Sequence, residues 1–245
     1  FPYTTLFRSK FTGAELYEKT LAVVGLGRAW QLKPLFEGTK VAFVSRRTGK
    51  AEIYVTNLAR SKTLRLTNYR NTSYGPRWSA DGKRVFFISS FRSNFPEIFS
   101  TNGVGEAAKV ITNVRGALGA ASSGPDGRIA FASSNKETMD IFVAGPQGQS
   151  PIRVIKAPNK QWVNTDPAWS PDGSQLAVTL SKDGNAEIYV ISASGGAIVR
   201  RLTNNRAIDS GAAWSPSGRE IAFARTSPAS VTGPSNPPRA ARYGA

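Results

Sequence analysis

The sequence predicts an all-β fold, a β-propeller, and three observations lead to this prediction. Glycines recur at a spacing of 44, 45, 46 and 45 residues, at Gly38, Gly82, Gly127, Gly173 and Gly218. Each of them opens a short apolar segment: KVAFVS, RVFFIS, RIAFAS, QLAVTL or EIAFAR. Each unit of about 45 residues holds four such strand-like segments, which is the period of a propeller blade.

The first segment of each unit has the alternation of a β-strand. In KVAFVS, Val41 and Phe43 fall on one face, while Ala42 and Val44 fall on the other. This alternation supports a strand.

The other three segments of a unit recur in a constant order. They are EIYVTN, EIFSTN, DIFVAG and EIYVIS, from Glu52, Glu97, Asp140 and Glu187; RLTN, VITN and RLTN, at 65–68, 110–113 and 201–204; and RWSADG, AWSPDG and AWSPSG, around Trp78, Trp169 and Trp214. Asp-Gly pairs predict tight turns, because Gly accepts positive φ and Asp bonds its own turn. The recurring Trp is expected to pack between neighbouring blades.

The repeat divides the chain into four segments. Residues 38–225 are expected to be a partial β-propeller with four complete blades and the first strand of a fifth. Residues 10–37 are expected to be the last helix and linker of a preceding α/β domain, since Thr12 and Glu15 have capping-box spacing. Residues 226–245 hold four Pro without alternation and are expected to be disordered or out of frame. Residues 1–9, FPYTTLFRS, match the translation of a sequencing adapter, and are expected to be an artefact.

Composition excludes several classes of chemistry. The 245 residues include no Cys and no His, so disulfides, thiolate metal sites, imidazole catalysis and a Ser-His-Asp triad cannot be built from them. No catalytic residue, cofactor site or metal site is expected. The net charge is +16, but the basic residues are interspersed singly without a set of stacked aromatics. This pattern indicates that the basic residues keep the protein soluble and protect strand edges, and it argues against a nucleic-acid-binding surface.

The repeated [DE]-[IL]-Y-V, R-x-L-T-N and W-S-P-D-G motifs resemble the TolB-type repeat, a WD40-like repeat also called PD40. The resemblance is most complete in residues 165–203 and covers about three-quarters of the chain. It implies a six-bladed propeller in a periplasmic, non-enzymatic scaffold of the Tol-Pal envelope system. Its implied partners are the Pal lipoprotein and the Tol complex proteins, and its implied role is in outer-membrane integrity and cell division. A signal peptide is expected upstream, and no transmembrane segment is expected within the sequence.

The resemblance also implies where Pal would dock: on loops just before the W-S-P-D-G turns. The matching positions are Thr72, Ser73 and Tyr74; Ala117–Ala120, which include Leu118; Asn164, Thr165 and Asp166; and Ile208, Asp209 and Ser210. We expect them to be exposed loop tips held by a rigid sheet. The alternative is that they only begin strands or cap turns. The second unit departs from the pattern in having ASSGPDG without its Trp, and the third in having IKAPN in place of L-T-N.

Two other functions remain open from the sequence. Propellers of this repeat type also act as gates of α/β-hydrolase serine peptidases, in which case the catalytic domain would lie outside this sequence. A basic nucleic-acid-binding module is the third reading, and it predicts a steep salt dependence of binding.

Overall fold

The computed structural model describes residues 15–17, 20–22, 40–57, 62–69, 71–102, 108–111, 116–135, 138–159, 161–226 and 239–242. The described residues contain β-strands, turns and loops, and no helix. The all-β prediction is confirmed.

The chain divides into two compact units, one of Leu32–Thr165 and one of Phe1–Gln31 with Asp166–Ala245. The first unit contains a three-stranded sheet, β3-β4-β5, and two four-stranded sheets, β6-β7-β8-β9 and β10-β11-β12-β13. Their strands are β3 Lys40–Thr48, β4 Lys50–Asn57, β5 Lys62–Arg65, β6 Ser73–Trp78, β7 Val85–Ser89, β8 Glu97–Thr101, β9 Lys109–Val110, β10 Ala117–Ser123, β11 Ile129–Asn135, β12 Thr138–Ala144 and β13 Ile152–Ile155.

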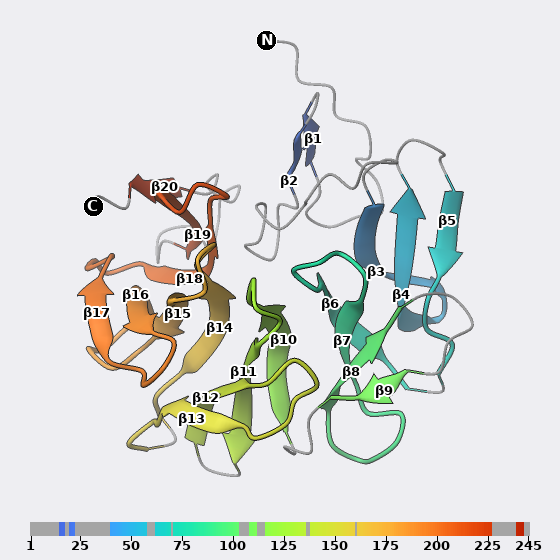
Figure 1. The fold of residues 1–245 in the computed structure, drawn as a ribbon, viewed down its shortest axis with the longest axis horizontal. Helices are drawn as coiled ribbons and strands as arrows, with labels where there is room; N and C mark the ends of the chain where they lie inside the picture. The colour runs from blue at the N-terminus through green and yellow to red at the C-terminus, as the bar shows by residue number, and fades with distance from the viewer. Residues whose placement is uncertain are drawn as a thin grey trace. The chain divides into compact units, whose positions relative to one another are not determined.

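The second unit contains the sheets β14-β15-β16-β17 and β18-β19-β20, and the small sheet β1-β2. The first two residues of β14 belong to the other unit. The strands are β1 Glu15–Tyr17, β2 Thr20–Ala22, β14 Asn164–Trp169, β15 Gln175–Leu180, β16 Glu187–Ser192, β17 Ile198–Arg201, β18 Ile208–Trp214, β19 Glu220–Thr226 and β20 Arg239–Arg242. In Figure 1 each sheet is an antiparallel meander whose strands follow one another in chain order.

The repeat and the sheets agree in number of strands but differ in phase. Strands β3 to β18 are the sixteen strands of the four complete repeats, and β19 is the first strand of the fifth. The strand that ends in the W-S-P-D-G motif, however, pairs with the strand that follows the turn: β6 pairs with β7, and β18 with β19. A sheet therefore begins one strand before the repeat that the glycines define, because the Asp-Gly turn is the hairpin inside the sheet.

Hydrophobic cores lie between the faces of successive sheets. On β7, Val85 and Phe87 belong to a cluster with Ile53 of β4, while Phe86 and Ile88 belong to another with Phe131 of β11. Both faces of this strand are therefore buried.

The recurring Trp packs as expected at two of its positions. Trp78 lies against the cluster of Ile53 and Val85. In the other unit, Trp214 of β18 is part of a cluster with Ile188 of β16. Its indole Nε1 donates a hydrogen bond of 3.1 Å to the carbonyl oxygen of Ala168, which ties two sheets together.

The two ends differ from the sequence-based expectation where they are described. Residues Glu15–Tyr17 and Thr20–Ala22, expected in a helix, form the hairpin β1-β2 with Leu16 opposite Leu21. A short helix is marginal without a packed face, and two residues between β1 and β2 permit a hairpin. Residues Arg239–Arg242, for which one expectation was disorder, pair as β20 with the open edge of β19, since backbone pairing needs no alternating side chains. The alternative that residues 226–245 are out of frame stays a prediction. Residues 1–9 and the rest of both ends lie outside the described residues.

Candidate partner-binding site

The positions expected to contact a partner lie at equivalent places in their sheets. Each of β6, β10, β14 and β18 is the first strand of its sheet, and they begin at Ser73, Ala117, Asn164 and Ile208. The turn with the Asp-Gly or Ser-Gly pair follows the far end of each strand. The expected contact residues therefore lie at one end of every sheet, and the turns lie at the other.

Three of these residues are buried, which corrects the expectation that all of them are exposed loop tips. Ser73, Asn164 and Asp209 are each at most 1% exposed. All three stand nine residues before the glycine of the following turn. Their side chains face the sheet because they already belong to the first strand, where alternate side chains point to opposite faces. They can position the neighbouring residues, but they offer no surface to a protein partner.

The polar side chains at this position are satisfied across the hairpin in two of the sheets. Ser73 is opposite Ser89, and their Oγ atoms are 3.2 Å apart. Asp209 is opposite Arg225, whose Nε and Nη2 donate hydrogen bonds of 2.7 and 2.8 Å to the two carboxylate oxygens. Asn205 Nδ2 donates a third bond to Asp209, at 2.8 Å. These bonds attach the start of the first strand to the end of the second.

The environment of Asp209 also determines its charge. Burial by itself would raise the pKa of Asp209, but the hydrogen bonds from Arg225, Asn205 and Thr203 hold it below its usual range. The carboxylate is therefore ionised at neutral pH, and it is occupied in a bidentate ion pair.

Asn164 is the exception at this position. Its side chain is 1% exposed, and neither Oδ1 nor Nδ2 has a hydrogen-bond partner among the described residues. Seven residues after the turn glycine, where the other two sheets have Ser89 and Arg225, the third has Leu180. The apolar residue at that place is the physical reason that this amide lacks the partner that the others have.

Neighbouring positions are exposed. Tyr74 is 38% exposed and Ile208 is 51% exposed, and Thr72 is exposed as well. Thr165, Asp166 and Ser210 are half-buried. Leu118 belongs to β10 and is opposite Ala132, but its side chain lies outside the description. In β6 and β18 an exposed residue, Tyr74 or Ile208, therefore stands next to the buried one, whereas in β14 the residues after Asn164 are half-buried or buried.

A left-handed residue distorts three of the first strands seven residues before the turn glycine. Gly75, Asp166 and Gly211 have φ of 63°, 53° and 64°. The pairing of β6 with β7 shifts register after Tyr74, and that of β18 with β19 shifts after Ser210, as in a β-bulge. Asp166 adopts this conformation without the freedom of glycine, which costs about 1 kcal/mol or more. The bulge redirects the strand just after its exposed residues.

The E-I-Y-V and R-L-T-N motifs form buried ion-pair networks, a role that the sequence analysis missed. The carboxylates at the start of the third strand, Glu52 and Glu187, are at most 1% exposed. Thr67 donates a hydrogen bond to Glu52, and Thr203 donates one to Glu187. The same two Thr oxygens accept bonds from the N–H groups of Ile53 at 2.8 Å and Ile188 at 2.9 Å.

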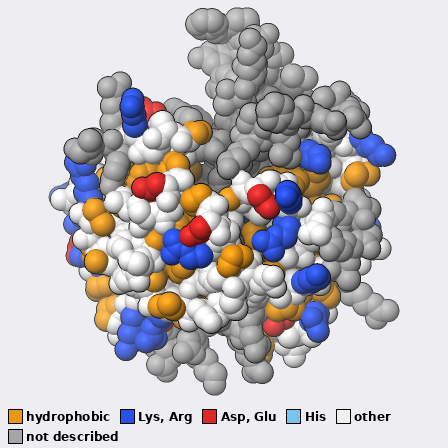
Figure 2. Space-filling view, in the orientation of Figure 1, with side chains coloured by type: hydrophobic (Ala, Val, Ile, Leu, Met, Phe, Trp, Pro, Cys, Tyr) orange, Lys and Arg blue, Asp and Glu red, His pale blue; other side chains and the backbone are white. Residues whose placement is uncertain are grey.

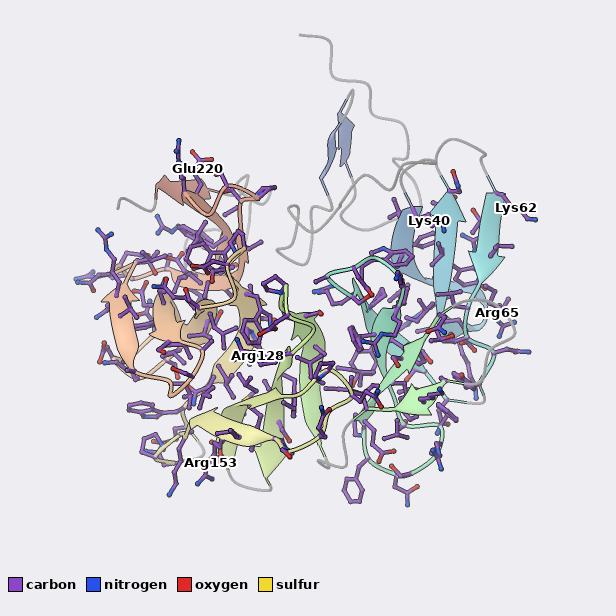
Figure 3. The ribbon with its side chains drawn as sticks, in the orientation of Figure 1. Lys40, Lys62, Arg65, Arg128, Arg153 and Glu220 are labelled. Atoms are coloured by element: carbon purple, nitrogen blue, oxygen red, sulfur yellow. The ribbon has the colours of Figure 1, made fainter. Side chains whose placement is uncertain are left out.

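An arginine on the last strand of the sheet completes each network. Arg65 of β5 lies 3.0 Å from Glu52, and Arg201 of β17 lies 3.5 Å from Glu187. Arg153 of β13 pairs with Asp140 at 3.3 Å, and Figure 3 labels Arg65 and Arg153 on their strands. In these three units an Arg follows the acidic residue after 13 or 14 residues, and this spacing was the signal in the sequence that could have predicted the ion pairs. These motifs hold the third and fourth strands together and are not free to bind a ligand.

The turns are stabilised by their own side chains. Asp81 accepts hydrogen bonds from Ser79 Oγ and from the N–H of Lys83 at 3.1 Å, and Asp172 accepts equivalent bonds from Ser170 and Ser174. The serine hydroxyl bond is the main reason that the pKa of each aspartate is lowered. The conserved geometry of the turn therefore explains the S-x-D-G pattern.

The described residues offer no group of three or more His, Asp or Glu side chains placed to hold a metal ion. Within the same residues, no helix has the length and apolar character needed to cross a membrane.

Comparison with known proteins gives a consistent result. Residues 155–229 match the family model of the TolB beta propeller domain, PD40. A protein TolB homolog of Chlorobium luteolum is 29% identical over 161 residues, which are 65% of this chain and 35% of the relative. A Tol-Pal system protein TolB of Desulfosudis oleivorans is 27% identical over 171 residues, 70% of this chain and 28% of the relative. The chain thus spans about a third of the length of these relatives.

Solved structures share the fold. The crystal structure of TolB from Acinetobacter baumannii superposes with a TM-score of 0.69 at 22% identity, over 81% of this chain and 50% of the other. A puromycin-hydrolysing peptidase of Mycobacterium tuberculosis superposes with a TM-score of 0.57 at 16% identity, over 81% of this chain and 35% of the other. At these identities the superpositions concern the fold. Together with the repeats, they show a β-propeller fold that is similar to that of TolB, and residues 155–229 match the model of the TolB beta propeller domain.

Proposed function

We propose that this protein is a non-enzymatic periplasmic scaffold of the Tol-Pal system. It binds the Pal lipoprotein and the Tol complex proteins, and it supports outer-membrane integrity and cell division. The observation that supports this proposal most is the match of residues 155–229 to the TolB propeller domain, together with relatives named as Tol-Pal system proteins. The absence of His and Cys from the sequence agrees with a binding role.

Pal contacts the exposed residues at the start of the first strands. In the unit Leu32–Thr165 these are Thr72 and Tyr74, and Thr165 lies at the position of Tyr74, eight residues before its turn glycine. Leu118, nine residues before Gly127, is a further expected contact. Tyr74 is the expected anchor, since exposed aromatic rings contribute much of the binding free energy at protein interfaces. Burial raises the pKa of the Tyr74 hydroxyl, so it stays protonated and able to donate a hydrogen bond to the partner.

The other unit offers equivalent positions, described here by themselves. In β18 Ile208 is exposed and Ser210 is half-buried, and in β14 Asp166 is half-buried. The buried residues Ser73, Asn164 and Asp209 position their exposed or half-buried neighbours and do not contact the partner.

The experiment is a calorimetric titration of the chain with the periplasmic domain of Pal. Replacement Tyr74→Ala is expected to weaken binding about tenfold or more, equivalent to about 1.4 kcal/mol. Thr165→Arg is expected to weaken it by steric overlap. The matched control is Leu64→Ala on β5, because Leu64 is 40% exposed and Tyr74 is 38% exposed, while Leu64 lies on the last strand of the sheet β3-β4-β5 and away from the first strands.

Two results would contradict the proposal. If the unaltered chain does not bind Pal, the assignment to the Tol-Pal system fails, although the propeller fold stands. If Leu64→Ala weakens binding as much as Tyr74→Ala, the contact surface is elsewhere. Circular dichroism of each variant separates a lost contact from a lost fold.

A propeller gate of a serine peptidase is the second candidate, favoured only by the fold likeness to the puromycin-hydrolysing peptidase. The superposition is poorer than that with TolB. A peptidase gate would not bind Pal, so the same titration separates the two functions.

A further inference from the structure

A groove lies at the turn end of the sheets in the unit Leu32–Thr165, opposite the end that begins with Thr72 and Tyr74. Its volume is about 530 Å³, and it is open to solvent. Three short stretches of the chain line it: the turn between β6 and β7, the residue after β8, and the turn between β12 and β13. The lining residues are Asp81, Lys83, Arg84, Asn102, Pro146 and Gln147.

The groove has an excess of positive charge. Lys83 and Arg84 form no side-chain ion pair with any described residue. Asp81 is the one carboxylate among the lining residues, and it is already bound to Ser79 Oγ and to the N–H of Lys83. Asp81 attracts both Lys83 and Arg84, and it offsets only one of the two positive charges, so these three side chains leave the groove with a net positive charge.

The guanidinium of Arg84 is held at the wall of the groove. Its Cζ lies 5.4 Å from the ring centroid of Phe86, which is fully buried. Its Nη2 lies 3.5 Å from the carbonyl oxygen of Pro146, at the limit of a hydrogen bond. Arginine has five N–H donors in a planar fork, so several remain for an oxyanion.

This pair of cations is specific to one turn. The two residues after the turn glycine are Lys83 and Arg84 here, but they are Arg-Ile, Ser-Gln and Arg-Glu in the turns at Gly127, Gly173 and Gly218. Arg128, in the first of those, folds back onto Asp126 of its own turn. A residue pair needed only for the turn would be expected to recur with the repeat.

The groove differs in this respect from the general basic surface. In Figure 2 the Lys and Arg side chains of the visible face are spread among apolar, acidic and neutral ones. Lys83 and Arg84 instead stand next to each other in a concave surface together with the amides of Asn102 and Gln147. Concavity, two cations and amide groups are the features of a site for a small anion.

We infer that this groove binds an oxyanion, a carboxylate or phosphate group of a small ligand, which Arg84 and Lys83 hold. Arg84 presents its fork to two oxygens of the anion, and Lys83 adds a second charge from the exposed side. This site lies at the other end of the sheet from the proposed Pal surface and is independent of it.

The test titrates the chain with two probes: inorganic phosphate and the peptide acetyl-tetraglutamate-amide, at about 50 mM salt, where surface charges are only partly screened. The variant Lys83→Gln with Arg84→Gln is expected to weaken binding at least tenfold. The control is Arg200→Gln with Arg219→Gln, which removes the same charge from two exposed residues of the other unit. It is expected to change affinity less than twofold.

The two probes distinguish the source of the anion. Saturable phosphate binding without peptide binding assigns the groove to phosphate-type ligands, and the reverse assigns it to carboxylates. The inference is overturned if neither probe binds saturably, or if the control variant weakens binding as much as the groove variant. If the groove variant unfolds, the exposed single change Lys83→Glu replaces it, and it must also abolish binding.

Discussion

The buried carboxylate of Glu187, at the start of β16, should be a major determinant of stability, and Glu187→Ala tests this. Glu187 is fully buried and accepts hydrogen bonds from Thr203 and from the N–H of Asn205 at 2.7 Å. Arg201 Nη2 lies at 3.5 Å. The substitution removes the acceptor of both neutral donors in one step.

The expected magnitude follows from these contacts. A buried donor left without a partner costs about 1–3 kcal/mol. Arg201 does not become isolated, since it keeps Asp183 at 3.1 Å and the carbonyl oxygen of Thr203 at 2.8 Å. The full cost of breaking a buried ion pair, about 3–5 kcal/mol, therefore does not apply. We expect Glu187→Ala to lower the free energy of unfolding by about 2–4 kcal/mol, and Glu187→Gln by about 1–2 kcal/mol.

Urea unfolding followed by circular dichroism measures this change from the midpoint and slope. The control is Glu220→Ala, because Glu220 also begins a strand but is half-buried and forms no ion pair within the described residues. Its expected cost is below about 0.5 kcal/mol. The reasoning is refuted if Glu187→Ala costs no more than Glu220→Ala.

Two further predictions concern a turn and an ion pair. Gly148→Ala should destabilise the protein by about 2 kcal/mol or more, because the φ of Gly148 is +77° and an added Cβ would lie 1.5 Å from the carbonyl oxygen of Ile111. At Gly184 an added Cβ meets nothing within 4 Å, so Gly184→Ala should cost only the backbone strain of about 1 kcal/mol. Thermal unfolding of both variants checks this, and equal losses of stability would contradict it. The pKa of Asp209 is lowered in the folded state, so its stabilising contribution is present above the unfolded pKa of about 3.9 and is lost as the pH falls below it. Urea midpoints at pH 7 and pH 3 should therefore differ more for the unaltered chain than for Asp209→Asn, and an equal difference would show that the pair with Arg225 does not contribute.

The fold was largely predictable because the repeat states the same local information several times. The glycine spacing, the alternation in KVAFVS and the Asp-Gly turns each predict a strand or a turn, and β3 to β19 follow them in order. The phase of the sheets was not predictable, since a repeat can be cut at any of its four strands. Which strand comes first in a sheet follows only from pairing across the turn.

The ends of the chain were harder to predict because they lie outside the repeat, so each structural signal in them occurs only once. The Thr12 and Glu15 spacing favoured a helix, but the described part of that segment pairs as β1 and β2. The Pro-rich tail favoured disorder, but Arg239–Arg242 pair with β19. In both cases a partner strand, which local sequence does not reveal, determined the outcome.

Sequence alone determined the class of fold, the number of strands in each repeat, the turns and the exclusion of imidazole and thiol chemistry, because these depend on local patterns and composition. Tertiary structure decided which polar residues are exposed. Ser73, Asn164 and Asp209 are as polar as the residues beside them, yet they are buried because their place in the first strand turns their side chains inward, and cross-strand partners satisfy Ser73 and Asp209 there. The motifs of Glu187 and Arg201 also acquired their role only in three dimensions, where strands separated in sequence bring an acid and a base together.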